Sequence, residues 1–259
     1  MSEAYVFLGP TLARSAAQAE LDAVYLPPVS AGDVGRLGRS RPLAIGIVDG
    51  YFEHVPAVWH KEIMWIMAQG VHVFGSAGLG ALRAAELDSF GMRGVGRVYQ
   101  GIKDGTLDRD DEVAVAFEER RDGYPALSEA MVSIRATLEA AANSAQIISG
   151  VTRDVLAAAG AALFYRNRNW PAVLEAGKAQ GADPAELGAL SRWLPDGRVN
   201  LQADDALAML REMRDFLAGS PAPLRVPWTV ANTTRWLAAQ DHADRDGAAP
   251  GDDRQGRRG

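Results

Sequence analysis

Three turns carry most of the residues that could do chemistry, and each turn follows a short apolar run of the chain. They comprise residues 9–11 (GPT), 49–54 (DGYFEH) and 75–80 (GSAGLG). In an open parallel sheet, ligands bind in the crevice beyond the carboxyl ends of the strands. We therefore predict that the polar and small residues of these turns meet in one functional site.

The candidates for acid–base chemistry lie in and just after the second turn. Asp49 directly follows an apolar run and could reach into the crevice, although Asp-Gly is also a common turn pair. His60 lies close to Glu62 on a predicted helix, and a nearby carboxylate can tune an imidazole for proton transfer. We interpret His72 as a structural residue of a strand. The histidines lack the spacing of a helical zinc pair, so we expect no bound metal.

The third turn has the composition of an anion site at the start of a helix. Glycines let backbone N–H groups approach an anion, and the helix dipole favours negative charge there. Arg83 follows about one helical turn later and could reach the same anion or pair with Glu86. The alternative is that the small residues serve tight packing of the helix on the sheet. Ser76 could be a nucleophile or a hydrogen-bond donor, but it lacks the flanking pattern of a hydrolase elbow.

These considerations give two sets of candidate residues, and they require no cofactor. The turn lacks the Gly-Lys-Ser/Thr ending of a P-loop, and residues 91–99 predict loop and helix rather than the acidic strand of a dinucleotide site. The candidates for catalysis are Asp49, His60, Glu62, Ser76, Arg83 and Glu86. The candidates for binding an anion or substrate are Gly9, Thr11, Tyr51, His54, Lys61, Gly75, Gly78 and Gly80.

Alternating strands and helices must position these turns. Short apolar runs closed by Gly or Pro predict buried strands, and the helical patterns between them favour a parallel sheet with flanking helices over residues 1–125. A helix is expected to begin at Pro56 and end at Gly70, and a second to cover residues 79–87. The predicted strands are residues 5–8, 23–26, 43–48 and 71–74, with a further edge strand at 113–117.

The character of the chain changes after about residue 128. Apolar stripes at helical spacing predict a mostly helical C-terminal portion. We divide the chain into an α/β core at 1–127, a helical portion at 128–240 and a disordered tail at 241–259, which has no large apolar residue. The expected helices are residues 128–145, 155–170, 184–194 and 204–217.

Composition excludes several classes of function. The net charge of −6 gives no electrostatic reason to bind nucleic acid or an anionic membrane, and no apolar run is long enough to span one. The start of the chain lacks the features of a signal peptide, so we expect a cytoplasmic protein. The absence of cysteine excludes disulfides, a cysteine nucleophile and a persulfide on this chain.

Taken together, these motifs resemble the TfuA-like family over roughly residues 5–140. The stretches that carry the resemblance are FLGPTL at 7–12, IGIVDGYFEHVPAVWHKEI at 45–63, GVHVFGSAGLGALRAAEL at 70–87 and FGMRGVGRVYQGIKDGTLDRDDEVAV at 90–115. In one respect the chain departs from the family pattern. The family's glycine-rich turn has a serine near the position of Gly78, whereas this chain has its serine at Ser76.

The resemblance implies a role beside a YcaO-type enzyme, which uses ATP to activate a peptide backbone amide for conversion to a thioamide. It implies that the TfuA-like partner releases sulfide by hydrolysing a thiocarboxylated, ubiquitin-like carrier of the ThiS type. The precursor peptide would be a further partner. We therefore favour an accessory hydrolase for peptide thioamidation. The alternatives are a non-catalytic docking partner of a YcaO enzyme, and a nucleotide or small-molecule enzyme using the anion site between Gly75 and Arg83.

Overall fold

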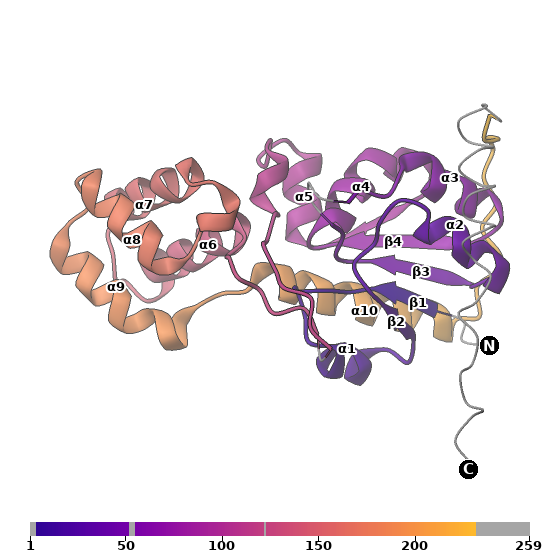
Figure 1. The fold of residues 1–259 in the computed structure, drawn as a ribbon, viewed down its shortest axis with the longest axis horizontal. Helices are drawn as coiled ribbons and strands as arrows, with labels where there is room; N and C mark the ends of the chain where they lie inside the picture. Colours follow the sequence, from indigo (N-terminus) through magenta and orange to yellow (C-terminus); the bar gives the residue numbers. More distant parts are fainter. Residues whose placement is uncertain (1–3, 52–54, 122, 232–259) are drawn as a thin grey trace, which may run out of the picture.

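A five-stranded parallel sheet forms the centre of the molecule and confirms the predicted α/β class (Figure 1). The computed structural model describes residues 4–51, 55–121 and 123–231. The strand order is β2-β1-β3-β4-β5, so the chain starts in the middle of the sheet and reverses direction between β1 and β3. The strands are β1 (Ala4–Phe7), β2 (Val24–Leu26), β3 (Ala44–Ile47), β4 (His72–Ser76) and β5 (Arg93–Val95).

Helices cover both faces of the sheet, which is why its central strands are apolar on both sides. All four residues of β3 are buried. One core lies beneath α2 (Asp33–Leu37), α3 (His60–Ala68), α4 (Leu79–Leu87) and α5 (Arg97–Lys103). The other core lies beneath α1 (Arg14–Glu20) and α10 (Leu201–Ala218), which runs along the opposite face in Figure 1.

Four local expectations differ from the structure, one of them in the helical portion, where the expected helix 155–170 is interrupted: one helix ends at Ala162 and the next begins at Trp170. Residues 93–95, which we expected to be loop, form the edge strand β5, whose side chains include no long apolar run that would mark a strand. Residues 113–117 form no strand among the described residues, and only Phe117 makes an isolated bridge, to Ala126. Helix α3 begins at His60 rather than Pro56, because the Glu62 side chain caps it at Trp59.

A second group of helices encloses a third apolar core to one side of the sheet (Figure 1). It comprises α6 (Met131–Glu139), α7 (Gly150–Ala162), α8 (Trp170–Ala179) and α9 (Pro184–Gly197). Side chains of Ser149, Asn169 and Asp183 cap the starts of α7, α8 and α9. The remaining short turns are the 3₁₀ helices Gly38–Ser40, Asp88–Phe90, Asp110–Glu112 and Tyr165–Asn167 and the π-helix Ala140–Ser144.

The last helix, α10, returns from this group to the sheet. A Cβ atom added to Gly46 of β3 would lie 2.9 Å from Met213 Sδ and 3.0 Å from Met209 Cε, so the strand and α10 are in close contact. The Asp205 carboxylate on α10 accepts hydrogen bonds from the backbone N–H groups of Arg97 and Val98, at 2.9 and 2.7 Å. Helix α10 therefore caps α5 and belongs to the packing of the sheet. No helix among the described residues is long and apolar enough to cross a membrane.

Acidic residues between α5 and α6 join the helical group to the rest. The side chain of Arg168 is 1% exposed and forms an ion pair with the Asp111 carboxylate, and it also donates to the Asp111 carbonyl at 2.6 Å and the Gly160 carbonyl at 3.2 Å. Arg135 makes a two-pronged contact with buried Glu112, at 2.8 and 3.0 Å. These acids, which the sequence left without a role, are thus partners of helical-group arginines.

We expect Arg168→Met to lower the free energy of unfolding by about 1–3 kcal/mol, because it removes three hydrogen bonds that a buried guanidinium group donates. Urea unfolding followed by circular dichroism measures the change. Arg153→Gln is the matched control, since Arg153 pairs with exposed Asp154 at the surface, where such pairs contribute about 0–1 kcal/mol. Equal effects of the two substitutions would contradict a structural role for Arg168.

Candidate functional site

The carboxylate of Asp49 lies where the sheet changes direction, and it ties together the ends of β1 and β3. Its Oδ2 atom accepts hydrogen bonds from the backbone N–H groups of Gly9 at 2.8 Å and Thr11 at 3.3 Å. Its Oδ1 atom accepts from the Thr11 hydroxyl at 2.6 Å. In sheets of this strand order, the ligand crevice opens at this reversal. The structure thus brings together the first two predicted turns through Asp49, Gly9 and Thr11.

Burial perturbs the acidity of Asp49. The residue is 6% exposed, and desolvation raises the pKa of its carboxyl above the usual value of 3.8, while the hydrogen bonds from Thr11 and Gly9 act in the opposite direction. A buried carboxyl with a raised pKa at the end of a strand is a candidate proton acceptor. The same three hydrogen bonds also fix the loop after β1, so Asp49 orders this loop whatever its chemical role.

The glycine-rich turn after β4 packs closely against β3. A Cβ atom on Gly80 would lie 1.8 Å from the Ile47 carbonyl oxygen, and one on Gly75 would lie 2.2 Å from the Gly80 carbonyl oxygen. The Gly80 N–H group donates to the Val48 carbonyl at 3.3 Å, so this amide already has a partner within the protein. Tight helix–sheet packing, the alternative to an anion site, therefore accounts for Gly75 and Gly80.

The middle of the same turn borders the Asp49 carboxylate. A Cβ atom on Gly78 would lie 3.4 Å from Asp49 Oδ1 and 3.0 Å from the Val48 carbonyl oxygen. Ala77 before it adopts a left-handed backbone conformation with φ of 62°, which costs free energy for a residue other than glycine. Gln202 of α10 donates to the carbonyls of Ala77 at 3.4 Å and Val113 at 3.0 Å. The third turn thus meets the other two at Gly78.

Ser76 lies at the end of β4 and is 0% exposed. Its hydroxyl donates to the carbonyl of Val95 in the neighbouring strand β5, at 2.8 Å. A hydroxyl in this position joins two strands of the sheet. Its part in catalysis stays a prediction, without support from the geometry.

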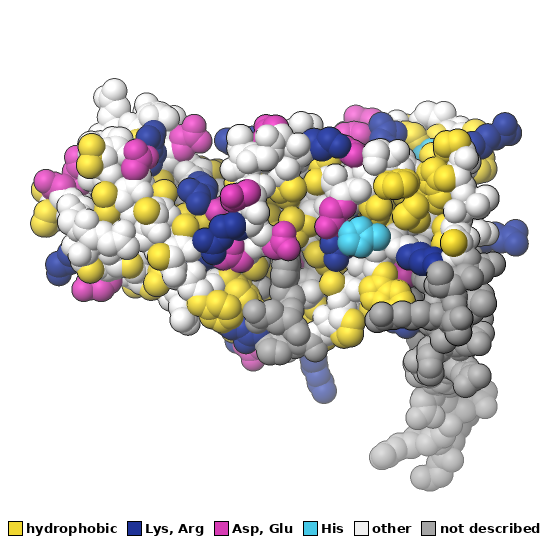
Figure 2. Space-filling view, turned by 90° about the horizontal axis from the view of Figure 1, so that it is seen from above, with side chains coloured by type: hydrophobic (Ala, Val, Ile, Leu, Met, Phe, Trp, Pro, Cys, Tyr) yellow, Lys and Arg dark blue, Asp and Glu magenta, His cyan; other side chains and the backbone are white. Residues whose placement is uncertain are grey.

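Arg83, Glu86 and His60 form a separate cluster on the outer side of α3 and α4. Arg83 donates to Glu86 Oε2 at 2.8 Å and to the Val58 carbonyl at 3.1 Å, and His60 Nε2 lies 2.7 Å from the same Glu86 oxygen. His60 and Glu86 are about half exposed, whereas the Arg83 side chain is only 14% exposed. On the face that carries these helices, a histidine lies among acidic and basic side chains (Figure 2). The structure thus groups three predicted residues, with Arg83 held by partners inside the protein.

Glu62 is a structural carboxylate. It is 3% exposed, and Oε2 accepts from the N–H group of Gly32 at 2.8 Å, while Oε1 accepts from that of Trp59 at 3.4 Å. Burial raises the pKa of Glu62, and these backbone hydrogen bonds lower it. His72 Nε2 lies 2.9 Å from the Ala222 carbonyl, in keeping with its structural interpretation. Lys61 is half-buried on α3, and His54 lies outside the described residues.

Residues 116–121 and 123–127 form a hairpin over the ends of β1 and β2, and Tyr51 holds it in place. Its hydroxyl donates to Glu119 Oε1 at 2.5 Å, which together with burial raises the pKa of Tyr51. Its ring lies 5.7 Å from that of Phe117, which in turn lies 5.8 Å from that of Tyr124. The ladder contacts of this hairpin are the bridges of Phe117 to Ala126 and of Arg120 to Gly123.

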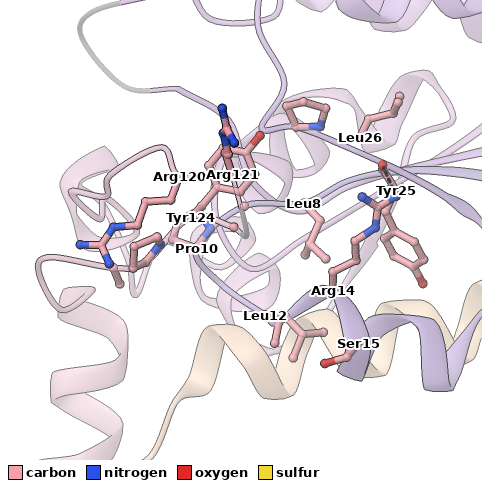
Figure 3. A pocket seen from close by; sticks show the side chains of 16 residues that line it. Leu8, Pro10, Leu12, Arg14, Ser15, Tyr25, Leu26, Arg120, Arg121 and Tyr124 are labelled. Carbon is pink, nitrogen blue, oxygen red and sulfur yellow. Dashed lines mark hydrogen bonds between the residues drawn. The ribbon is translucent and has the colours of Figure 1, made fainter. Parts of the chain in front are cut away.

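Beneath this hairpin lies a cavity of about 820 Å³ that the sequence analysis did not identify (Figure 3). Gly9 and Pro10 of the first turn line it, so the cavity adjoins the loop that Asp49 holds. Arg14, Arg120 and Arg121 also line it. The one feature of the sequence that could have indicated this cavity is the adjacent pair Arg120-Arg121 in an acidic chain. Arg14 lies far from this pair in sequence and gave no such indication.

We expect Gly80→Ala to destabilise the protein by about 1–3 kcal/mol or more, because the added methyl group meets backbone atoms of β3 that cannot rotate away. Gly35→Ala in α2 is the control, because a Cβ atom there has no neighbour within 4 Å. That substitution should stabilise the protein by about 0.4–1 kcal/mol. Thermal unfolding of both variants tests the prediction, and an unchanged melting temperature for Gly80→Ala would refute the close contact.

We expect Asp49→Asn to cost about 1–3 kcal/mol at low pH, because an amide cannot accept all the hydrogen bonds that the carboxyl group receives. Because the pKa of Asp49 is raised on folding, wild-type stability falls as the pH rises from 3.8 through the native pKa. The difference in unfolding free energy between wild type and variant should therefore narrow over that interval. Urea unfolding at a series of pH values measures it, and a difference that widens would mean that the native pKa is lowered.

Comparison with known proteins identifies a family for the part of the chain that contains Asp49, the glycine-rich turn and the hairpin. Residues 49–169 match the family model described as TfuA-like protein. Strands β1, β2 and β3 of the sheet and helix α10, which packs on it, lie outside the matched segment. In the comparison with curated proteins, none matches the chain. TfuA-like proteins are associated as a family with YcaO enzymes. Residues 49–169, just under half of the chain, are thus similar to the TfuA-like protein family.

Proposed function

We propose that this protein releases inorganic sulfide from the thiocarboxylate of a ThiS-like carrier protein and so supplies a YcaO-type enzyme in peptide backbone thioamidation. Two facts support the proposal beyond the family match. Buried Asp49 lies at the sheet reversal and accepts a hydrogen bond from Gly9, a residue that lines a cavity with three arginines. The chain has no cysteine, so sulfur cannot be carried on it as a persulfide or mixed disulfide. Of these, the link from Asp49 through Gly9 to the cavity carries the argument.

The proposed reaction is the hydrolysis of an acyl–sulfur bond. A water oxygen attacks the carbonyl carbon of the thiocarboxylate, negative charge develops on the former carbonyl oxygen, and the carbon–sulfur bond then breaks. The products are the carrier carboxylate and hydrogen sulfide ion, with one proton released. Water is the nucleophile because the Ser76 hydroxyl is buried and bonded to Val95. The sulfide passes to the YcaO enzyme, which bonds it to the amide carbon of the precursor peptide, and the amide oxygen, activated by ATP, leaves that carbon as phosphate.

We assign to Asp49 the role of the general base that accepts a proton from the attacking water. Burial raises the pKa of its carboxyl, so its carboxylate is a stronger base than an exposed one, and positioned bases contribute about 10²–10⁴-fold to such reactions. Cationic groups that meet the developing negative charge contribute comparably, about 10²–10³-fold for one donor. The cavity arginines are the candidates for that role.

The docking alternative has one observation in its favour. His60, Glu86 and Arg83 form a connected polar cluster at the surface of α3 and α4, away from the cavity lining. Such a cluster suits contact with a partner protein as well as chemistry. A nucleotide site at the glycine-rich turn has less support, because the amide of Gly80 already donates to Val48 and the turn is buried.

Incubation of the purified protein with a carrier thiocarboxylate tests the proposal directly, in the presence and absence of a YcaO enzyme. Intact mass spectrometry should show the carrier converted to carboxylate, with the mass of this chain unchanged and sulfide found in solution. Asp49→Asn should lower the rate by about 10²-fold or more. Ser76→Ala should retain activity, since its hydroxyl joins two strands.

Arg192→Gln on the exposed surface of α9 is the control for loss of an arginine elsewhere. Arg83→Ala tests whether the cluster of Arg83, Glu86 and His60 takes part in the chemistry or only in docking. A soluble, folded variant that loses sulfide release would give Arg83 a part in the chemistry, and wild-type release would exclude one. If the carrier is not converted under any condition while YcaO-dependent thioamidation still requires this chain, the docking function is the correct one.

A further inference from the structure

The cavity beneath the hairpin has a wall of apolar side chains and a concentration of positive charge. It lies at the carboxyl ends of β1 and β2. Leu8, directly after β1, and Leu26, the last residue of β2, form its wall, which Leu12, Pro10 and Pro27 extend. Its volume of about 820 Å³ is in the range of sites that enclose an organic ligand rather than a small inorganic ion.

Of the described residues that line this cavity, three are arginines and none is acidic. This contrasts with a net charge of −6 for the whole chain. Arg14 lies on the sheet side, and Arg120 and Arg121 lie on the hairpin side (Figure 3). Arg14 donates to the Tyr25 carbonyl at 3.1 Å, and Arg120 pairs with Glu118 at 2.7 Å. In the described part of the chain, Arg121 has no ion pair with an acidic residue.

The hairpin that carries two of these arginines is closed at its base by hydrogen bonds between its two sides. Leu127 N–H donates to the Ala116 carbonyl at 2.7 Å, and Ala116 N–H donates to the Ser128 hydroxyl at 2.8 Å. Contacts of Tyr51 with Glu119 and Phe117 tie it to the chain just after Asp49. The positions of the hairpin arginines are therefore set by the same turn that holds the candidate base.

We propose that this cavity binds the carboxyl-terminal end of an extended peptide chain, with the guanidinium groups receiving the terminal carboxylate or thiocarboxylate. This proposal rests on the function proposed above and adds the site and its residues. Guanidinium groups match carboxylates in a two-pronged geometry, and the apolar wall accommodates the residues that precede the chain end. Gly9 and Pro10 border both the cavity and the Asp49 hydrogen bonds, so a bound chain end lies beside the candidate base.

A nucleotide fits these observations less well. Phosphate groups are bound in such folds by backbone N–H groups of a glycine-rich turn at a helix start. Here the glycine-rich turn precedes α4 and is buried, whereas the arginines lie at the other side of the sheet reversal, by β1 and β2. Inorganic pyrophosphate is therefore the appropriate competing probe.

Binding to a dye-labelled six-residue peptide, Ala-Leu-Ala-Leu-Ala-Gly, tests the proposal with the full-length protein. Fluorescence anisotropy should show the free-acid peptide binding at least about tenfold more tightly than the same peptide with a C-terminal amide, because the amide removes the charge that the arginines receive. Arg121→Gln and Arg14→Gln should each weaken binding of the free acid about tenfold and leave the amide unaffected. Arg192→Gln should change neither, and unchanged melting temperatures should show that the variants are folded.

Equal affinity for acid and amide, or wild-type affinity in Arg121→Gln, would overturn the proposal. Pyrophosphate that binds more tightly than the free acid would overturn it in favour of a phosphate ligand. If Arg14→Gln fails to fold, the affinity of Arg121→Gln decides the question, since Arg121 has no ion pair with an acidic residue in the described part of the chain. A sulfide-release assay separates the two proposals. Unchanged release in both arginine variants would refute binding of the chain end in the cavity but leave the proposed hydrolysis standing. Peptide binding by a protein that releases no sulfide would refute the hydrolysis but leave the binding site standing.

Discussion

The hydrogen bonds of the Asp49 carboxylate are the interaction on which the candidate site depends. Two backbone N–H groups and one hydroxyl from the loop after β1 converge on a single side chain at the end of β3. The adjacent strands β1 and β3 carry connections that leave in opposite directions, so nothing in the sheet ladder itself orders the space between their ends. Asp49 supplies that order, and the glycine-rich turn then packs against it at Gly78.

This arrangement has a thermodynamic cost that suits a functional position. Burial of Asp49 raises the pKa of its carboxyl, so its ionised form is less stable in the fold than in water. The left-handed conformation of Ala77 in the adjoining turn adds a second local cost. Strained and desolvated groups concentrate where a protein binds or transforms a ligand, because elsewhere selection has no reason to retain them.

The helical group contributes to the site indirectly. Its arginines Arg135 and Arg168 hold Glu112 and Asp111, which lie just before the hairpin. On the other side, α10 packs on the sheet and holds the backbone at Ala77 and Val113 through Gln202. The hairpin is thus fixed at its start by the helical group and α10, and along its length by Tyr51. The cavity beneath it exists because these separate parts of the chain are joined.

The sequence by itself determined the α/β class, the central strands and the three turns, because buried strands need apolar runs and their ends need small or polar residues. It did not determine β5, since Arg93–Val95 has no strand pattern and pairs only because β4 offers an open edge. Nor did it distinguish Asp49 from Glu62 or Ser76, because all three are polar residues near strand ends or a helix start, and only their buried partners separate their roles. The arginine cavity was decided by tertiary structure alone: Arg14 and Arg121 are remote in sequence, and the hairpin's attachment to Tyr51 is what places them around one space.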